Sequence, residues 1–440
     1  MASTFVSQLF NSIADAGREL LDRGTGKSRS HSIEGLCSDL LTQKGEASGM
    51  ALAREVVEVW ETLPENEKLE FLEFLDRELA PDPNRIAGAV VAYQKDVSAE
   101  TLQNLNEAIE APRQELMRRI NFAPGGTTAI VSMRKFLVGQ LRARPELKYV
   151  DGDIQHLLSS WFNRGFLELQ RIDWRTPAVV LEKLIEYEAV HAIDGWDDLR
   201  RRLDKDRRCF AFFHPALPDE PLIFVEVALV RGLAEAVQPL LSQETERGIA
   251  EDADTAIFYS ISNCQEGLKG ITFGNFLIKQ VVAELSAELP NLKHFATLSP
   301  IPGFMRWLSS AKGRTGGVTA KEVSAVKSFL AEKDWFENPD VVEQVREPLT
   351  KLCAHYLVNE KSRDRPLDPV ARFHLGNGAM LEQMNWLGDK SANGIKQSAG
   401  LLVNYYYSLK HIERNHEAYA NERKIIASSS ILSLAKPGKK

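Results

Sequence analysis

The sequence predicts an α+β protein in which an all-helical first part precedes a second part built on a mixed β-sheet. Up to about residue 165, apolar residues recur at three- and four-residue spacing, the period of amphipathic helices, and strand patterns are absent. After about residue 205, short runs of β-branched and aromatic residues alternate with turn signals. We therefore expect a helical bundle domain over 1–168 and a mixed-sheet domain over 169–440.

The helical pattern of the first part occurs in five segments, separated by loop signals such as PDPN and APGG. We expect helices over 49–63, 66–79, 99–120, 129–143 and 153–166. None of these segments carries a cluster of reactive side chains. A role in packing or oligomerisation is therefore their simplest interpretation.

The second part begins with two apolar runs, 208–213 and 221–230, whose connection HPALPDE predicts a hairpin. A strand over 256–262 then leads through a loop into an amphipathic helix over 276–289. A further strand is expected over 293–299. The order strand, loop, helix, strand places the loop between a strand end and a helix N-terminus.

Composition limits the classes of function. The 440 residues are 44% hydrophobic and 26% charged with a net charge of −7, which argues against general binding of nucleic acids or anionic membranes. No apolar run approaches the roughly 18 residues of a membrane span, and neither end carries a targeting pattern, so we expect a cytoplasmic protein. The four cysteines form no CxxC pair and the histidines are scattered. We therefore predict neither a disulfide framework nor a metal site.

The loop 263–275 contains three glycines and joins the predicted strand to the predicted helix. Unpaired backbone amides at such a helix N-terminus can bind phosphate oxygens, and Lys269, Gly270, Gly274 and Asn275 lie where that cradle would form. The spacing is neither GxGxxG nor a P-loop, so a mononucleotide-type Rossmann site is disfavoured. A glycine turn that only reverses the chain remains the alternative.

The stretch SPIPGF (299–304) places Ser299 before two prolines that are one residue apart. Proline fixes its own φ and pushes the preceding residue towards an extended conformation. The hydroxyl of Ser299 is therefore held stiffly at the end of a predicted buried strand. Such a position suits a side chain that must orient a substrate.

A second candidate reactive residue is His374, in the frame FHLGNGA (373–379). Two glycines and an asparagine close to a histidine predict a tight turn that presents the imidazole. The alternative is a buried histidine that only hydrogen-bonds a carbonyl. His214 and His294 are competing candidates for the reactive imidazole.

Five motifs together resemble malonyl-CoA decarboxylases, and the resemblance extends over about residues 110–435. The motifs are SPIPGF, FHLGNGA, GLKGITFGNFLIKQV, EAVHAIDGWDDLRRRL and LLSSWFNRGFLEL. The resemblance implies a helical oligomerisation domain, forming a homo-oligomer such as a dimer or tetramer, and a catalytic domain with the fold of GCN5-related N-acetyltransferases. It also implies that malonyl-CoA is converted to acetyl-CoA and carbon dioxide without a cofactor. In that fold the strands 257–262 and 294–299 would splay apart to admit the pantetheine arm.

The resemblance assigns residue roles by motif. The catalytic serine falls on Ser299 and the catalytic histidine on His374. The acyl-CoA-binding loop falls on Lys269, Gly270, Ile271, Thr272, Phe273, Gly274 and Asn275. The family pattern has an acidic residue where this chain has Thr272, so no role is carried over for that carboxylate. Tyr407 in NYYYSL is a candidate pocket hydroxyl, with core packing as the alternative.

The expected chemistry is loss of carbon dioxide to give an enolate, with Ser299 orienting the malonyl carboxylate and His374 protonating the enolate. A serine hydrolase is disfavoured because the GxSxG elbow is missing. An acyl-CoA-dependent acyltransferase on the same fold is the main alternative. A CoA-binding scaffold without catalysis is the third.

Overall fold

The computed structural model describes residues 2–24, 32–43, 45–271, 277–311, 313, 315 and 317–436. Contacts divide the chain into two compact units. Unit 1 comprises Met1–Glu168, Phe213–Glu220 and Gln265–Phe273, and unit 2 comprises Leu169–Phe212, Pro221–Cys264 and Gly274–Lys440. Two short segments of the later sequence therefore pack with the helical part. The division of the chain into domains at 168/169 stays a prediction.

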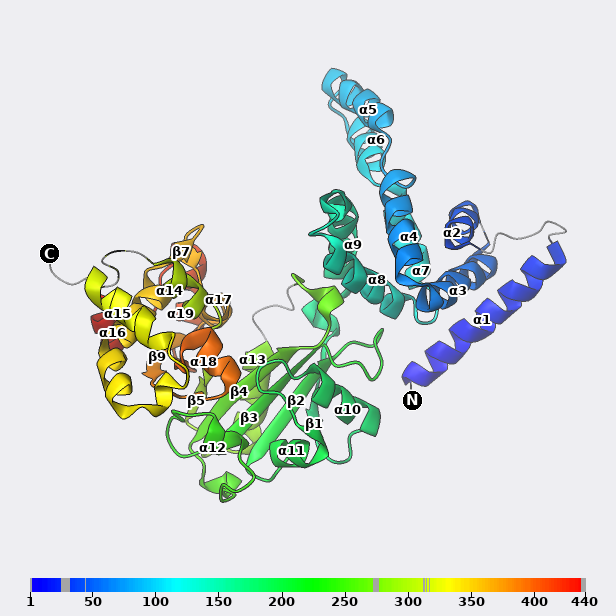
Figure 1. The fold of residues 1–440 in the computed structure, drawn as a ribbon. Coiled ribbons are helices and arrows are strands. Elements are labelled where there is room, and N and C mark those ends of the chain that lie inside the picture. The colour runs from blue at the N-terminus through cyan, green and yellow to red at the C-terminus, as the bar shows by residue number, and fades with distance from the viewer. Residues whose placement is uncertain are drawn as a thin grey trace. The chain divides into compact units, whose positions relative to one another are not determined.

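Unit 1 is built of helices (Figure 1). They are α1 (Ala2–Gly24), α2 (Ile33–Thr42), α3 (Glu46–Thr62), α4 (Glu65–Arg77), α5 (Pro83–Lys95), α6 (Ala99–Ile109), α7 (Pro112–Asn121), α8 (Gly126–Gln140) and α9 (Lys148–Trp161), with 3-10 turns η1 (Pro145–Leu147), η2 (Arg164–Phe166) and η4 (Glu266–Leu268). The expectation of one helix over 99–120 was wrong. Pro112 lacks the N–H that the helix needs and disfavours a helical Ala111, so α6 ends before it and α7 begins at it.

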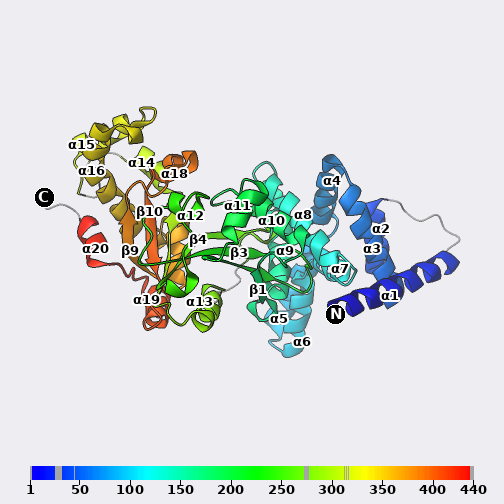
Figure 2. The same cartoon turned by 90° about the horizontal axis from the view of Figure 1, so that it is seen from below.

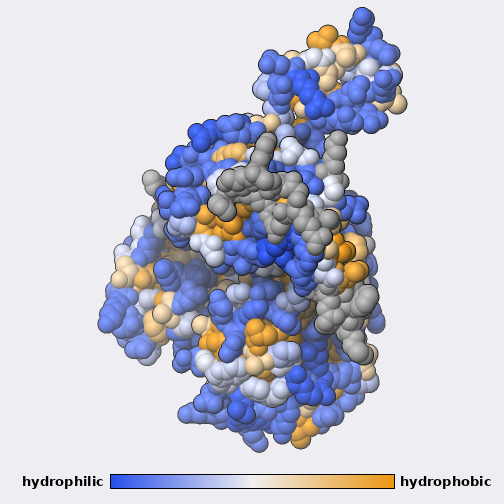
Figure 3. Space-filling model, turned by 90° about the vertical axis from the view of Figure 1, so that its right-hand side faces the viewer, coloured by the Kyte–Doolittle hydropathy of each residue, from blue (hydrophilic) through white to orange (hydrophobic). Residues whose placement is uncertain are grey.

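Helix α5 was not expected from the sequence, and it forms a hairpin with α6. Asp82 accepts a hydrogen bond from the Asn84 amide and Pro83 takes the first helical position, which together start the helix. In α5, all of whose residues are described, no side chain is buried. The hairpin lies at the top of Figure 1, and the top of Figure 3 shows hydrophobic residues among hydrophilic ones. Val91 and Val97 are 64% and 74% exposed.

Unit 2 is organised around a mixed sheet of eight strands, so the predicted α+β fold class is confirmed. The order is β1-β2-β3-β4-β5-β10-β6, and β9 also pairs with β10. The strands are β1 (Glu168–Ile172), β2 (Arg207–Phe213), β3 (Ile223–Val230), β4 (Thr255–Asn263), β5 (His294–Thr297), β6 (Ser299–Pro300), β9 (Met380–Asn385) and β10 (Leu402–Tyr406); β7 (Lys361–Ser362) and β8 (Arg365–Pro366) form a separate ribbon. The predicted hairpin is the antiparallel pair β2–β3.

The central strands separate at the point that matters for the site. β4 and β5 pair in parallel from Thr255↔His294 to Phe258↔Thr297. The Leu298 amide still donates to the Phe258 carbonyl of β4, but Ser299 pairs with Val403 of β10. Proline at 300 has no N–H to continue a ladder with β4. The two strands therefore splay, as the sequence led us to expect.

Helices surround this sheet. They are α10 (Ala178–Tyr187), α11 (Gly195–Arg202), α12 (Gln238–Leu241), α13 (Leu277–Glu288), α14 (Phe304–Ser310), α15 (Ala320–Leu330), α16 (Pro339–Val358), α17 (Pro369–Gly376), α18 (Ala392–Ser398), α19 (Ile412–Glu422) and α20 (Ser429–Leu434), with 3-10 turns η3 (Ala250–Asp252) and η5 (Trp335–Glu337). Figure 2 shows α14, α15, α16 and α20 gathered at the end of the sheet formed by β9 and β10. Helix α13 buries Leu277, Val281 and Leu285 at helical spacing. Within the described ranges, no helix is both long and apolar enough to cross a bilayer.

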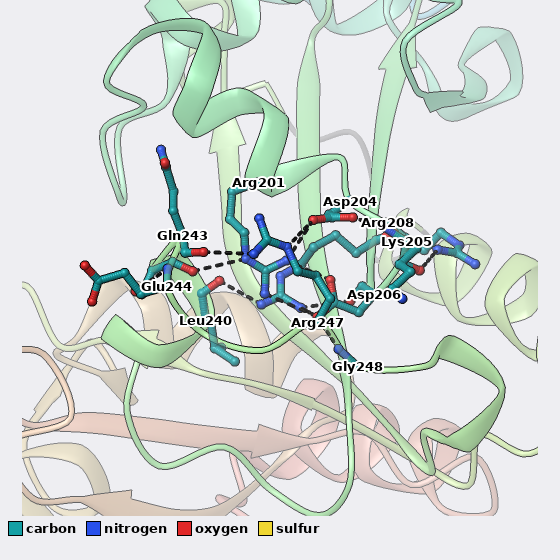
Figure 4. Close-up of polar contacts among 12 residues, drawn as sticks. Arg201, Asp204, Lys205, Asp206, Arg208, Leu240, Gln243, Glu244, Arg247 and Gly248 are labelled. Atoms are coloured by element: carbon teal, nitrogen blue, oxygen red, sulfur yellow. Dashed lines mark hydrogen bonds and ion pairs between the residues drawn. The ribbon is translucent and has the colours of Figure 1, made fainter.

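A buried ion cluster fixes the start of β2 (Figure 4). Arg201 donates to both carboxylate oxygens of Asp206, at 2.7 and 3.2 Å, and the Gly248 amide donates to the same carboxylate. Arg201 also donates to the Ser242 carbonyl at 3.2 Å. The loop between α12 and η3 is thereby tied to the sheet. We call this set the Arg201–Asp206 cluster.

Candidate active site

The splayed strands border a cavity of about 260 Å³ that lies wholly within unit 2. Its walls come from β3, β4, the first turn of α13, the Ser299–Pro300 segment and α17. Apolar side chains such as Ile223, Ile261 and Phe373 dominate the lining. None of the described lining residues is an aspartate, glutamate, lysine or arginine. The cavity is therefore a low-polarity compartment with a few polar groups, among them Ser299 and His374.

Ser299 lines the cavity from the two-residue strand β6 and is buried. Its hydroxyl donates to the Thr297 hydroxyl at 2.8 Å. Thr297 is fixed in turn, because its hydroxyl accepts from the Tyr405 amide and its carbonyl accepts from the Asn404 side chain. The serine is therefore held by its backbone pairing and by its own hydrogen bond.

His374 lies in the last turn of helix α17, so the prediction of a tight turn at this residue was wrong. The helix forms because Asp368 caps its N-terminus and Pro369 takes the first helical position. The turn follows the histidine: Asn377 ends the helix and Gly378 has φ +83°. A Cβ at Gly378 would lie 2.1 Å from the Ile412 carbonyl oxygen, so the glycine allows α17 to approach α19.

The structure brings Ser299, His374 and Tyr407 together. Ser299 Oγ lies 3.1 Å from His374 Nε2, and Tyr407 Oη lies 2.8 Å from His374 Nδ1. The Tyr405 ring stacks on the imidazole with centroids 4.5 Å apart. The three side chains thus form one hydrogen-bonded chain that reaches the cavity through Ser299 and His374.

The direction of that chain follows from its hydrogens. Ser299 has one hydroxyl hydrogen and donates it to Thr297. His374 Nε2 must then be the donor to Ser299 Oγ. In a neutral ring Nδ1 is an acceptor, so Tyr407 donates to it. The imidazole therefore carries its hydrogen on Nε2, the nitrogen that faces Ser299.

Burial decides the charge of this chain. The desolvation of His374 lowers its pKa to about 3, so the ring is neutral at neutral pH. Burial raises the pKa of Tyr407 well above its usual value, so the phenol keeps its hydrogen. Ser299, His374 and Tyr407 therefore form a neutral relay.

Asp368 was not singled out from the sequence, although an aspartate directly before a proline is an N-cap signal. It is fully buried, and Oδ1 accepts from the Val370 and Ala371 amides at 2.9 Å each. Oδ2 accepts from the Gly303 amide and the Tyr356 hydroxyl, at 3.4 Å each. One carboxyl thus joins the helix that carries His374 to the turn that follows Ser299.

The predicted acyl-CoA loop is described only in part. Lys269, Gly270 and Ile271 are described and belong to unit 1, whereas Thr272, Phe273, Gly274 and Asn275 lie outside the described residues. The Lys269 and Ile271 amides donate to the Glu266 and Leu268 carbonyls. A phosphate cradle would therefore draw its amides from other residues of the loop, and it stays a prediction.

The competing histidines have other partners. His214 Nδ1 accepts from the Ala216 amide at 3.1 Å, and His294 Nδ1 lies 2.9 Å from the Tyr406 hydroxyl on the surface. Of these three histidines, it is His374 that lies within hydrogen-bond distance of Ser299. In the described part of the chain, no group of three or more His, Cys, Asp and Glu side chains could hold a metal ion.

Comparison with known proteins agrees with the motifs. The family model for the malonyl-CoA decarboxylase C-terminal domain matches residues 165–440, and that for the N-terminal domain matches 79–162. The mitochondrial malonyl-CoA decarboxylase of Anser anser anser is 39% identical over 401 residues, which cover 83% of this chain and 79% of the goose protein.

Two solved structures are also similar over nearly their whole length. The crystal structure of malonyl-CoA decarboxylase from Rhodopseudomonas palustris has a TM-score of 0.88 and 50% identity, covering 91% of this chain and 98% of that one. The crystal structure from Agrobacterium vitis has a TM-score of 0.86 and 50% identity, covering 92% and 99%. The resemblance seen in the motifs is confirmed: the chain belongs to the malonyl-CoA decarboxylase family and is a carboxy-lyase.

Proposed function

We propose that this protein converts malonyl-CoA to acetyl-CoA and carbon dioxide without a cofactor, with the acyl group in the cavity beside Ser299 and His374. Membership of the family supports the reaction. The observation that carries the site assignment is the 3.1 Å approach of Ser299 Oγ to His374 Nε2 at the cavity wall.

The cavity favours loss of the carboxylate. Decarboxylation breaks the bond between the carboxyl carbon and Cα, and the electron pair passes into the thioester carbonyl to give an enolate. A localised carboxylate is costly to hold among apolar groups without a cationic partner, and none of the described lining residues offers one. An enolate spreads its charge, so the transition state is penalised less than the bound substrate.

Ser299 and His374 have separate tasks in this proposal. Ser299 turns its hydroxyl hydrogen from Thr297 to the malonyl carboxylate when the substrate binds. It then holds the breaking bond perpendicular to the thioester plane, because only that orientation lets the electron pair enter the carbonyl. His374 donates its Nε2 hydrogen to Cα of the enolate. A neutral imidazole can act as a donor in a buried site, and the enolate carbon is a strong base. Water returns the proton that the reaction consumes.

Tyr407 serves the histidine. By donating to Nδ1 it keeps the ring hydrogen on Nε2, the nitrogen that faces Ser299. It also supports negative charge that develops on the ring as Nε2 gives up its hydrogen. Tyr407 therefore acts as a positioning residue in the proposed mechanism.

The decisive experiment supplies malonyl-CoA as the only substrate to the purified protein. Release of acetyl-CoA and carbon dioxide in equal amounts supports the proposal. An acyltransferase would require an amine or carrier acceptor and would consume no malonyl-CoA alone. A scaffold would bind CoA without turnover of any acyl-CoA. Either of these two results would overturn the proposal.

We also propose that the protein works in the cytoplasm as a homo-oligomer formed through the helical part. The exposed apolar residues of the α5–α6 hairpin, among them Val91 and Val97, support the oligomer. Sedimentation of the wild type and of a Val91→Asp, Val97→Asp double variant tests it. We expect the wild type to sediment as a dimer or tetramer; a monomeric wild type would refute the oligomer.

A further inference from the structure

Two stiff segments of unit 2 connect Ser299 to His374 by way of Asp368. From Ser299 the chain runs through two prolines to Gly303, and each proline fixes one φ. From His374, helix α17 runs back to its N-cap, Asp368. The two segments meet, because the Gly303 amide donates to Asp368 Oδ2 at 3.4 Å. Ser299 and His374 are therefore connected twice, once by their own hydrogen bond and once through Asp368.

The turn at Gly303 packs closely against this carboxylate. A Cβ at position 303 would lie 2.1 Å from Tyr356 Oη and 3.5 Å from Asp368 Oδ2, so a glycine is needed for the approach. Tyr356 Oη itself donates to Oδ2 at 3.4 Å. Asp368 and Tyr356 are 0% and 1% exposed. The junction is buried, so Gly303 cannot move towards α16 without displacing the tyrosine.

Capping of α17 does not by itself require the second carboxylate oxygen. Helix α16 also has a proline at its first position, and its N-cap is a neutral asparagine. Asn338 Oδ1 accepts from two amides of the first turn, at 3.1 and 3.5 Å. Asp368 caps α17 in the same way with Oδ1 alone. Its Oδ2 is therefore the atom that distinguishes it from a simple cap.

Asp368 does not act as a direct partner of the imidazole. The two ring nitrogens of His374 face Ser299 and Tyr407, so neither nitrogen is left for this carboxylate. Burial alone lowers the pKa of His374. Any influence of Asp368 on the histidine is therefore exerted through the position of α17.

We propose that Asp368 is a positioning residue for the decarboxylation: its Oδ2 holds the Gly303 turn against α17 and so sets the separation of Ser299 Oγ and His374 Nε2. The inference rests on the proposed function, because it takes Ser299 and His374 as the reactive pair. A displacement of about 1 Å at a reacting pair can cost about 10²-fold in rate. The prolines and the glycine of SPIPGF thereby gain a shared task.

The experiment compares Asp368→Asn with a matched control, Asp389→Asn. In Asp368→Asn the cap through Oδ1 can remain, but an amide nitrogen replaces Oδ2 and cannot accept from the Gly303 N–H. Asp389 is also buried, at 4% exposed, and accepts from Gln238 Nε2 at 2.8 Å and from the Ser391 amide at 2.9 Å. It joins two segments of unit 2 but does not line the cavity.

Steady-state kinetics with malonyl-CoA and crystal structures of both variants provide the two readouts. We expect Asp368→Asn to lower kcat about ten- to hundredfold with little change in KM. The Ser299–His374 separation should lengthen beyond hydrogen-bond range. Asp389→Asn should lose similar thermal stability but keep the wild-type kcat and separation. An unchanged Ser299–His374 separation in Asp368→Asn, or equal losses of kcat in both variants, would overturn the inference.

Gly303→Ala covers the case in which Asp368→Asn does not fold. It keeps Asp368 and its cap, but the new Cβ forces the turn away from Tyr356 Oη, so kcat should fall about tenfold or more. Gly376→Ala, whose Cβ would make an ordinary 3.7 Å contact with Tyr419, is its control and should retain wild-type kinetics. Wild-type kcat in Gly303→Ala would refute the inference.

The structural readout separates this inference from the proposed function. If the wild type releases no acetyl-CoA from malonyl-CoA, the proposed function fails. The Ser299–His374 separation in Asp368→Asn still shows whether Asp368 sets the geometry of the pair.

Discussion

Two buried polar groups of unit 2 use opposite strategies. In the Arg201–Asp206 cluster, charged side chains meet opposite charges and backbone groups. In the chain of Ser299, His374 and Tyr407, the side chains are neutral and one end borders a cavity. Complete pairing of charges leaves nothing to offer a ligand, whereas a neutral relay at a cavity wall can exchange hydrogen bonds with a bound substrate. The difference separates a structural cluster from a reactive one.

The pKa shifts of Asp206 in the cluster and of His374 in the relay have different causes. Burial acts to raise the pKa of Asp206, but the Arg201 hydrogen bond and the charges of Arg207 and Arg201 outweigh it and lower the pKa. For His374, burial alone lowers the pKa. A charged partner stabilises the first group in its ionised form, while the second is kept neutral by the absence of water.

The largest expected effect comes from breaking the neutral relay. Ser299→Ala and His374→Gln should each lower kcat by about 10²–10⁴-fold, the usual contribution of a positioned acid or base, with little change in KM. Rates of acetyl-CoA formation measure this. The control is His294→Gln, which alters a surface histidine bonded to Tyr406 and should retain wild-type kinetics. If both site variants stay within threefold of wild type, the assignment of the site fails.

Breaking the charged cluster should instead affect folding. Asp206→Ala leaves Arg201 buried without its carboxylate, which costs about 3–5 kcal/mol of unfolding free energy. Urea unfolding measures the loss. Glu347→Ala removes an exposed pair with Lys351 and should cost only about 0–1 kcal/mol. We expect the folded fraction of Asp206→Ala to keep a near-normal kcat. A large loss of kcat would contradict the purely structural role of the Arg201–Asp206 cluster.

The pH dependence of stability provides a third test. The pKa of His374 is about 3 in the folded state, below its ordinary value near 6.5 in the unfolded chain. Between these values the unfolded state binds more protons, so stability rises with pH across this window and falls as the solution is acidified. The histidine adds up to about 1.4 kcal/mol per pH unit to that slope. His374→Gln should show a correspondingly flatter slope in urea unfolding at several pH values.

The same pKa predicts an activity profile. Because His374 is already neutral in the free enzyme, it should cause no inflection in kcat/KM between about pH 5 and pH 8. An inflection that disappears in His374→Gln, measured on its residual activity, would contradict the neutral relay.

The smallest effect is expected at the far end of the relay. Tyr407→Phe removes one hydrogen bond to Nδ1, worth about 0.5–1.5 kcal/mol. A change of that size in the barrier lowers kcat about two- to tenfold. Tyr406→Phe, which alters the neighbouring surface hydroxyl, is the control. A Tyr407→Phe enzyme as inactive as His374→Gln would show that the phenol itself takes part in proton transfer.

Much of the fold could be predicted because local patterns and packing agree. The strands of the β2–β3 hairpin and the helix α13 follow their periodicity, and Pro300 marks where β5 leaves β4. His374 was predicted in a turn, but it lies in the last turn of a helix. The glycines that follow it do not show from sequence alone whether the histidine belongs to the turn or to the helix that the turn ends. The break at Pro112 was overlooked although proline at a first helical position is a known start signal.

Other features depend on contacts that no local pattern records. Asp368 joins Gly303 and the α17 N-terminus across a wide gap in sequence. The hydrogen bond from Arg134 Nη1 to the Gly267 carbonyl joins residues that are 133 positions apart in the sequence. Tyr407 could be named only as one hydroxyl among several tyrosines, since its bond to His374 exists only after the sheet has formed.

The inclusion of Gln265–Phe273 in unit 1 has a consequence for how the chain is made. During translation the helices of unit 1 emerge from the ribosome well before residues 265–273. The helices must therefore first pack together without this segment. Until residues 265–273 have been made, the Arg134 guanidinium lacks the Gly267 and Lys269 carbonyls, to which it donates hydrogen bonds in the folded protein. A fragment ending at residue 168 would lack this segment permanently. Unit 1 is complete only when the later segment packs against the helices.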